Sequence, residues 1–393
     1  MDEKEDLTSF ISFNEKKIPT QIKHRILQEY LRAWGGIICL KNRQVNLAFI
    51  DTCAGPGSYQ DTKNQGLAEG SPLIALRTLN VLKNDSRFAG KPINTKSLFI
   101  EKVPKFASAL ETLLKSNDTL GEYYEIKRAK FEDVLGYVLT FSQNNFAFIF
   151  ADPFGPSSIP FKSISKVVSQ KHCDTLINFP LYSIQKWGGL IGDYENIGQA
   201  KKVAYVTDFF GCDEWINVYQ KYHGTAALED ELLKLYTGNL KSLKVMVSDI
   251  PLQYEQKERT LFHLIFTTHN LAGLMAMKET MGSAKEHETM LREQSKHPGQ
   301  ISFGEVNNAW LVSKTVNSRI TPEEIANQII STLGTGIFKR RQIYEMFISD
   351  TPYLPSEINK ALTILKKQGK ATYFGESYFD QQIKLNKDVQ NKK

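Results

Sequence analysis

The stretch NLAFIDTCAGPG, at residues 46–57, constrains the fold of this chain more than any other. An apolar run leads into Asp51, and a turn with Gly55 and Gly57 follows at once. Buried parallel strands deliver nucleotide-type cofactors to a sheet edge in this way, and glycine lets the backbone turn sharply and approach a ligand. The spacing D-x-x-x-G-x-G differs from that of dinucleotide folds and lacks the Lys-Ser/Thr of phosphate loops. We therefore expect an α/β fold with a cofactor-binding turn; the open alternative is an ordinary turn that contains two glycines.

Further apolar segments follow at the intervals that such a sheet requires, at residues 97–101, 124–129 and 146–151. The first ends on Glu101, whose carboxylate is expected to accept hydrogen bonds from ribose hydroxyls of the cofactor. The second is weaker, and Phe131 and Glu132 after it are candidates to contact an adenine ring. Several strand ends with suitable polar chemistry, in the correct order, are much more specific than any one of them.

The segment 146–151 runs directly into Asp152-Pro153-Phe154-Gly155. This resembles the [DN]-P-P-[YFW] signature of amino-group methyltransferases. There a carboxylate and the proline carbonyl hold an exocyclic NH2, and an aromatic ring stacks on the base. Here the second proline is absent, so the ring is one position closer to Pro153. The alternative is a plain turn at the end of a strand, because Asp-Pro and Pro-Phe-Gly are common turn sequences.

Two segments around the first strand complete a family resemblance. Residues 21–27, with Lys23 and His24, precede the strand, and Gly-Ser-Pro at residues 70–72 follows it. Together with the motifs above, they make the chain resemble the three-cysteine-motif partner (TcmP) proteins of prokaryotes over roughly residues 15–280. The chain is more distantly similar to bacterial enzymes that methylate adenine N6 in large-subunit ribosomal RNA. Those enzymes carry a full D-P-P-Y, so a shared adenine target does not follow.

The resemblance implies a class I methyltransferase fold with S-adenosylmethionine (SAM) as cofactor, and a three-cysteine-motif protein as a partner. The cofactor contacts that we expect come from the helix, the turn and the strand ends: Lys23, Asp51, Ala54, Gly55, Pro56, Gly57, Glu101, Phe131 and Glu132. Asp152 and the Pro153 carbonyl would position the amine of a nucleic-acid base, Phe154 would stack on it, and transfer would be direct and in line. The rival hypothesis is a non-catalytic protein with a SAM-type fold that binds nucleic acid or a partner.

Composition describes a globular protein without a membrane-spanning segment. Of the 393 residues, 41% are hydrophobic and 23% charged, which suits one large or two ordinary domains. No apolar run reaches the length of a membrane span, and the acidic N-terminus is unlike a signal peptide, so we expect a cytoplasmic protein without membrane contact. The four cysteines show no C-x-x-C pairing, so neither a metal site nor disulfides are expected. A net charge of +6 permits nucleic acid as a partner without requiring it.

The N-terminal domain is expected to span residues 1–318. A long loop at 58–69 is a candidate lid or substrate reader. The elements expected in order are helices at 19–40, from Ser71 and at 161–170, a fifth strand at 174–180, and a sixth and an antiparallel seventh strand at 244–250 and 261–268. A helical insertion at about 181–240 is rich in aromatic residues, with Lys186 among them. It either stacks on bases beside phosphates or simply forms an aromatic core.

Residues 319–393 are expected to form a winged helix-turn-helix domain. Thr321-Pro322 with two following glutamates is a helix start, and three helices are predicted at 322–333, 338–348 and 355–368. Short strands at 371–375 and 377–380 would form the hairpin. Residues 321–393 hold 11 Lys and Arg against 8 Asp and Glu, a net charge of +3, and the third helix carries several lysines. Docking of DNA or RNA on this helix is expected, with a protein partner as the alternative.

Overall fold

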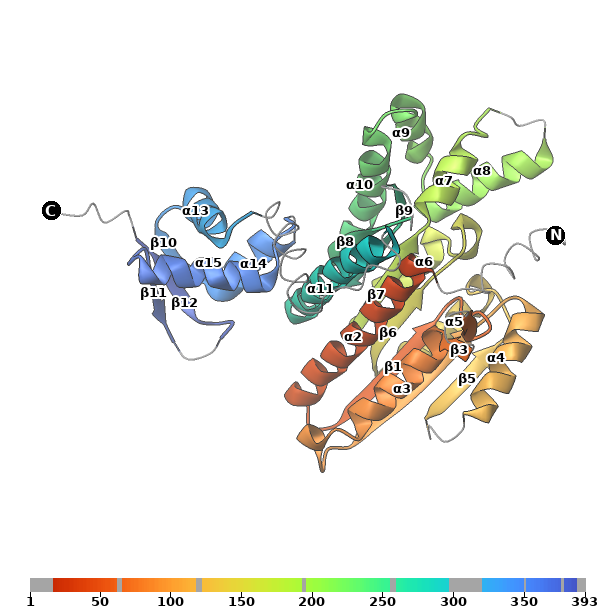
Figure 1. Cartoon of the computed structure of the whole chain (residues 1–393), viewed down its shortest axis with the longest axis horizontal. Helices are drawn as coiled ribbons and strands as arrows, with labels where there is room; N and C mark the ends of the chain where they lie inside the picture. The colour runs from red at the N-terminus through yellow and green to blue at the C-terminus, as the bar shows by residue number, and fades with distance from the viewer. Residues whose placement is uncertain are drawn as a thin grey trace. The chain divides into compact units, whose positions relative to one another are not determined.

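The computed structural model describes residues 17–61, 66–117, 122–192, 196–254, 259–296, 320–349, 351–375 and 378–386. The chain divides into two compact units, Met1–Leu274 and Met275–Lys393 (Figure 1). This division lies inside helix α11 (Leu271–Lys296), whereas the boundary predicted at 318/319 lies outside the described residues. Most of α11 therefore belongs to the C-terminal unit.

A seven-stranded sheet forms the centre of the N-terminal unit, in the order β5-β4-β1-β6-β7-β9-β8. Its strands are β1 (Val45–Asp51), β4 (Ile93–Ile100), β5 (Tyr123–Lys127), β6 (Phe146–Ala151), β7 (Cys173–Phe179), β8 (Met246–Gln253) and β9 (Thr260–Thr268). Neighbouring strands pair in parallel except β9, which is antiparallel to both β7 and β8. The predicted α/β class is confirmed, as is the antiparallel seventh strand, and the arrangement is Rossmann-like.

Side chains of the central strands alternate between two buried faces. On one face, the rings of Phe49 and Phe148 stack 6.2 Å apart, and Tyr30 of α2 (Ile18–Lys41) lies 5.3 Å from Phe148. On the other face, Ala48 and Ile50 belong to a core cluster with side chains from further helices. Helices that follow the strands are α3 (Ser71–Lys83), α4 (Pro104–Ser116), α5 (Leu135–Ser142) and α6 (Phe161–Val168). Because both faces are covered, the strands read as nearly continuous apolar runs.

The insertion after β7 is helical, as predicted, and comprises α7 (Leu181–Gly188), α8 (Ile197–Phe210), α9 (Glu214–Tyr222) and α10 (Ala227–Lys241). Its large rings are buried: Phe209 stacks on Tyr236 at 4.7 Å, and Phe210 on Trp215 at 6.1 Å. The aromatic-core interpretation is confirmed for these rings. Tyr182 remains 45% exposed.

The segment predicted as a loop at 58–69 contains two short antiparallel strands, β2 (Ser58–Asp61) and β3 (Gly66–Glu69). The Gly70 amide donates to the Gly57 carbonyl at 2.8 Å, which joins the end of this hairpin to the glycine turn. Ser71 is the first residue of helix α3 but not its N-cap, which is Gly70. The Ser71 hydroxyl instead hydrogen-bonds to Asp51.

The C-terminal unit contains α13 (Pro322–Leu333), β10 (Gly336–Lys339), α14 (Arg340–Ile348), α15 (Pro355–Lys367), β11 (Ala371–Phe374) and β12 (Gln382–Leu385). The three predicted helices are confirmed, and Thr321 and Glu324 form a capping box at the start of α13. The sheet order is β10-β12-β11. One strand prediction was wrong, because the partner of β11 is at 382–385 rather than 377–380, and β10 was not predicted. The reason is burial, since Ile383 and Leu385 alternate into the core at 0% and 1% exposure.

Candidate active site

Polar residues gather where four adjacent strands end. Asp51 closes β1, Glu101 follows β4, Asp152 follows β6, and Asn178 is the second-last residue of β7. In the register of the sheet, Asp51 lies opposite Phe99 and Phe150, so Glu101 and Asp152 each extend two residues beyond it. Because the carboxyl ends of parallel strands share one edge, the predicted strand-end acids are brought together there.

The glycine turn is built by backbone hydrogen bonds. Gly55 and Gly57 have φ of 62° and 82°, in the region that favours glycine. The Gly55 amide donates to Glu101 Oε2 at 2.8 Å, and the Ala54 amide donates to the Ile100 carbonyl at 2.9 Å. A Cβ on Gly57 would lie 2.7 Å from Leu110 Cδ1, so packing beneath the turn requires glycine as well.

Glu101 supports this turn from the next strand. Its second oxygen, Oε1, accepts from the Val103 amide at 2.8 Å, and the residue is 6% exposed. Burial raises the pKa of the Glu101 carboxyl, and the hydrogen bonds from Val103 and Gly55 oppose that rise only in part. Glu101 therefore stabilises the turn through hydrogen bonds, and it is also a candidate ligand for hydroxyl groups.

Asp51 lies under the turn with no solvent exposure. Its Oδ1 accepts from the Cys53 amide at 3.0 Å. Burial raises the pKa of Asp51 to about 7; the charges of Asp152 and Glu101 add to the rise, whereas hydrogen bonds from Ser71 and Cys53 oppose it. Burial likewise raises the pKa of the Cys53 thiol. Asp51 thus stabilises the conformation of the turn through a buried hydrogen bond.

Asp152 is held from two sides. Lys23 of α2 forms an ion pair with Oδ2 through its Nζ, and the side chains of Lys23 and Asp152 are 9% and 13% exposed. The Asn178 amide donates from Nδ2 to Asp152 Oδ1 at 2.9 Å and to the Pro153 carbonyl at 3.4 Å. Lys23, predicted among the cofactor contacts, is thus brought directly to Asp152. Asn178 was missed; the only signal was a polar side chain near the end of an apolar strand.

The remaining predicted residues fall into different environments. Phe154 is 61% exposed beside buried Pro153, as a stacking ring requires. Pro56 is half-buried in the glycine turn. By contrast, the Phe131 ring is 2% exposed and belongs to the hydrophobic core, which accounts for its position without a ligand. Glu132 is exposed and pairs with a neighbouring lysine at 3.5 Å.

The β2–β3 hairpin contributes Tyr59, which was not among the predicted site residues. The Tyr59 ring lies 5.6 Å from the buried His24 ring of α2. Burial raises the pKa of the Tyr59 hydroxyl, and the charges of Asp152 and Asp51 raise it further. Tyr59 is therefore within electrostatic reach of both acids, which puts the hairpin beside the candidate site.

Comparison with known proteins adds little. No protein-family model and no curated protein matches the chain. Among solved structures, it is similar to protein LPL1258 from Legionella pneumophila str. Philadelphia 1, described as DUF519, at 12% identity and a TM-score of 0.39. The likeness covers 68% of this chain and 91% of that one, and at this TM-score it carries no argument about function. Within the described ranges, no helix has the length and apolar character that crossing a lipid bilayer requires.

Proposed function

We propose that the chain is a SAM-dependent methyltransferase that acts on an exocyclic amine of a nucleic-acid base. The observation that carries this proposal is the meeting, at one sheet edge, of the Glu101-bound glycine turn and the Asp152–Pro153 pair of acceptors. The strand order supports it. Counted along the chain without the hairpin strands, the sheet reads 3-2-1-4-5-7-6 with an antiparallel seventh strand, as expected for the class I methyltransferase fold.

The residues at this edge fit SAM chemically. Glu101 accepts backbone hydrogen bonds from Gly55, Val103 and Lys102, and its carboxylate keeps acceptor capacity for a ribose hydroxyl. The Ala54–Gly57 backbone carries no side chain larger than proline, so a ligand can approach it closely. SAM, when bound, would supply an electrophilic methyl group. Asp51 acts from below by fixing the turn through the Cys53 amide.

The acceptors for an amine are already paired in a suitable geometry. A single NH2 group, that of Asn178, donates to both Asp152 Oδ1 and the Pro153 carbonyl. The exocyclic amine of a base is also an NH2 group, and it would use free lone pairs of the same two oxygens. The Lys23 ammonium balances the Asp152 charge. Catalysis would consist mainly of holding the nitrogen in line with the methyl group.

A non-catalytic SAM-fold binding protein is the second candidate, and two observations favour it. Both oxygens of Asp152 have intramolecular partners, Lys23 and Asn178, and the signature lacks its second proline. A substrate amine would have to share this carboxylate with them. On this hypothesis the Asp152 network stabilises the strand ends, and the pocket senses a ligand.

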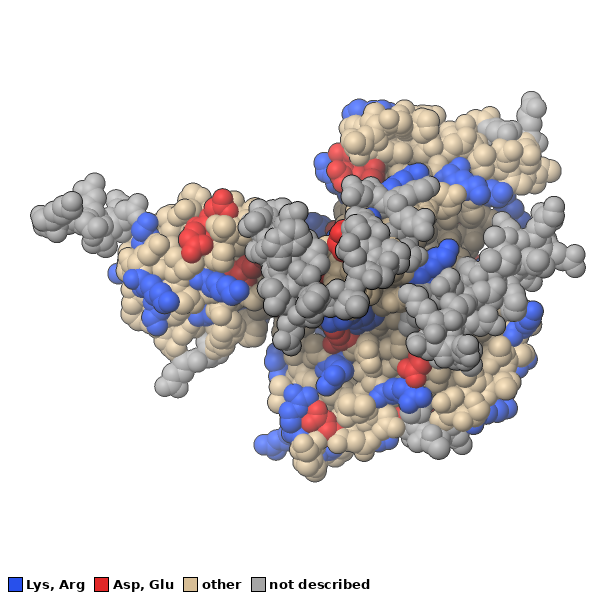
Figure 2. Space-filling view, viewed as in Figure 1, with Lys and Arg blue, Asp and Glu red and all other residues tan. Residues whose placement is uncertain are grey.

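We further propose that the C-terminal unit is a winged helix-turn-helix that binds nucleic acid. Its element order, α13-β10-α14-α15-β11-β12 with β12 between the other strands, supports this. The outward face of α15 carries Lys360, Lys366 and Lys367, all exposed. Figure 2 displays Lys and Arg side chains on the visible surface of this unit, together with acidic ones. Membership of the TcmP family, and a three-cysteine-motif protein as partner, stay predictions.

The test separates chemistry from binding. We expect the wild-type protein to bind SAM in calorimetry and to transfer labelled methyl groups to total cellular RNA or DNA, with the product identified by nucleoside mass spectrometry. Asp152→Ala should bind SAM within a few-fold of wild type but lose about 100-fold in turnover, because the side-chain acceptor of the amine is lost. Asp230→Ala, at an exposed position on α10, is the matched control. Full methylation by Asp152→Ala would contradict the catalytic role, and SAM binding without any methyl transfer would favour the second candidate.

A further inference from the structure

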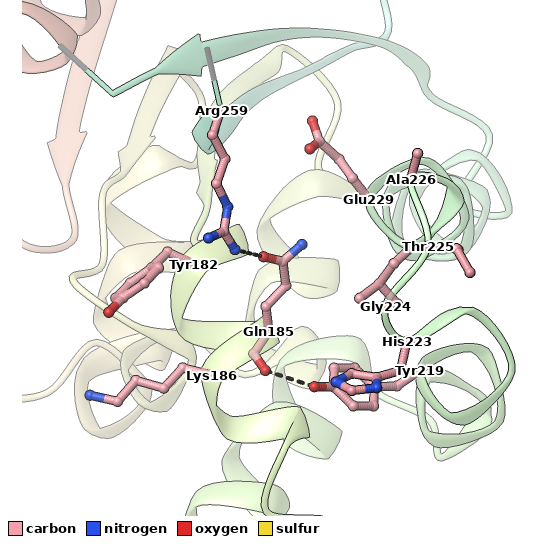
Figure 3. Close-up of a pocket in the computed structure, with 11 residues that line it drawn as sticks. Tyr182, Gln185, Lys186, Tyr219, His223, Gly224, Thr225, Ala226, Glu229 and Arg259 are labelled. Carbon is pink, nitrogen blue, oxygen red and sulfur yellow. Dashed lines mark hydrogen bonds between the residues drawn. The ribbon is translucent and has the colours of Figure 1, made fainter. Parts of the chain in front are cut away.

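A pocket of about 520 Å³ lies in the helical insertion of the N-terminal unit. Figure 3 shows Tyr182, Gln185 and Lys186 on α7, with Gln185 toward the segment between α9 and α10, and Arg259 just before β9. Arg259 Nη2 donates to Gln185 Oε1 at 2.6 Å, which fixes the guanidinium against α7. The volume suits one nucleotide-sized ligand rather than a solvent molecule.

The lining of this pocket is suited to an anion with a flat ring. Within the described part of the chain, no ion pair engages Lys186 or Arg259, and both are exposed. The carboxylate in the lining, Glu229, is instead bound to His263 Nε2 at 2.9 Å. Tyr182 is 45% exposed, and its ring is braced edge-on by Tyr254 at 6.2 Å. Two available cations beside a braced aromatic face match a phosphate and a base.

The same helix also borders the candidate active site. Helix α7 begins two residues after Phe179 and three after Asn178, which holds Asp152. At the other end of the Asp152-Pro153-Phe154-Gly155 turn, a Cβ on Gly155 would lie 3.7 Å from Ser183 and Trp187 of α7. The pocket and the turn are therefore both lined by one short helix.

We propose that this pocket binds a nucleotide next to the target base, with Lys186 and Arg259 on its phosphate and Tyr182 stacked on its ring. The proposal rests on the proposed function and assigns its substrate class: a single-stranded or locally unpaired nucleic acid, whose neighbouring nucleotide is bound while the target base reaches Asp152. A duplex with paired, stacked bases could not present a ring to Tyr182.

Binding of single-stranded hexanucleotides, RNA and DNA in parallel, tests this with the full-length protein. Lys186→Gln combined with Arg259→Gln should weaken binding about tenfold and reduce the slope of log affinity against log salt by roughly 1.4, about 0.7 for each lost phosphate contact. Tyr182→Ala should weaken binding roughly 5- to 100-fold with the slope unchanged, because stacking is uncharged. Lys201→Gln, at an exposed position on α8, is the control and should change neither. Unchanged affinity and slope in the double variant would overturn the proposal.

A cross-linking measurement makes the result independent of variant stability. Hexanucleotides that contain a photoreactive halogenated pyrimidine should cross-link to Tyr182, as mapped by peptide mass spectrometry. Cross-links confined to the C-terminal unit would also overturn the proposal. SAM binding is measured on the same samples: if SAM binds and the pocket variants change nothing, only the pocket assignment fails. If SAM does not bind at all, the proposed function itself is contradicted, whatever the pocket variants show.

Discussion

At the residue scale, Glu101 both stabilises the glycine turn through hydrogen bonds and is a predicted cofactor contact. Glu101→Ala removes the acceptors of the Gly55 and Val103 amides as well as those for ribose hydroxyls. We expect at least a tenfold loss of SAM affinity and a loss of about 1–3 kcal/mol in the free energy of unfolding, since buried donors lose a charged partner. Calorimetry and thermal unfolding measure the two effects, with Glu111→Ala, at a half-buried position on α4, as control. Wild-type SAM affinity in a folded Glu101→Ala protein would contradict the cofactor assignment.

Gly57 is a less informative position to test. The sequence indicated glycine there because a ligand approaches, but the structure gives two other reasons: φ of 82° and the leucine side chains beneath the turn. A larger residue would disturb the turn whether or not SAM binds. Residue chemistry at the ends of strands was predictable, because an acid after an apolar run is visible in sequence. The bonds of Asp152 to Lys23 and Asn178 were not predictable, because they join residues that are 129 and 26 positions apart in the sequence.

At the scale of elements, His263 joins β9 to β8 and to the helical insertion. Its ring is 4% exposed, with Nδ1 3.0 Å from Asp249 Oδ2 and Nε2 2.9 Å from Glu229 Oε1. Burial lowers the pKa of His263, but the bonds to Asp249 and Glu229 outweigh it, so the net pKa is raised. A raised pKa in the folded state contributes stability below the unfolded value of about 6.5 and loses it as pH rises through the folded pKa.

We therefore expect His263→Gln to lower the free energy of unfolding more at pH 6 than at pH 9. At pH 6 the loss should be roughly 1.5–3 kcal/mol, the range for hydrogen bonds to a charged group, and it should shrink as the wild-type imidazolium deprotonates. Urea unfolding followed by tryptophan fluorescence at a series of pH values measures it. His223→Gln, which removes an exposed histidine, should show no such pH dependence. An equal loss at both pH values would mean that His263 acts by packing alone.

Elements with strong periodicity were predicted better than short ones. Apart from β5, the sheet strands have a long buried face, as do the three C-terminal helices, and their positions match the structure within a few residues. The strands β2, β3, β10 and β12 are each four residues long, so their pattern is too brief to separate from a loop. Strand β12 was misplaced because the aromatic residues at 378–379 were more prominent than the alternating Ile383 and Leu385.

At the scale of the whole molecule, the sequence indicated two parts but not where α11 belongs. Lys278 of α11 donates from Nζ to the carbonyls of Ile348 and Thr351 at 2.5 Å each, and a Cβ on Gly282 would meet Leu354 at 2.8 Å. These contacts are long-range and leave no trace in composition. They also mean that deleting 321–393 would uncover α11, so loss of binding after truncation would not report on nucleic acid alone.

Charge substitution on α15 avoids that difficulty. Lys360, Lys366 and Lys367 lie on its exposed face and can be changed together to Gln. The buried residues Ile358, Leu362 and Leu365 stay unchanged, so the packing of the helix is preserved. We expect the triple variant to bind SAM as wild type does, but to lose nucleic-acid affinity and reduce the salt slope by roughly 2–3 for duplex DNA, because each phosphate contact contributes about 0.9. Lys201→Gln, Lys221→Gln and Lys234→Gln on the helical insertion form a matched control of equal charge. If the two triple variants behave alike, or if binding does not respond to salt, α15 is not a nucleic-acid contact, and a protein partner becomes the better explanation for this unit.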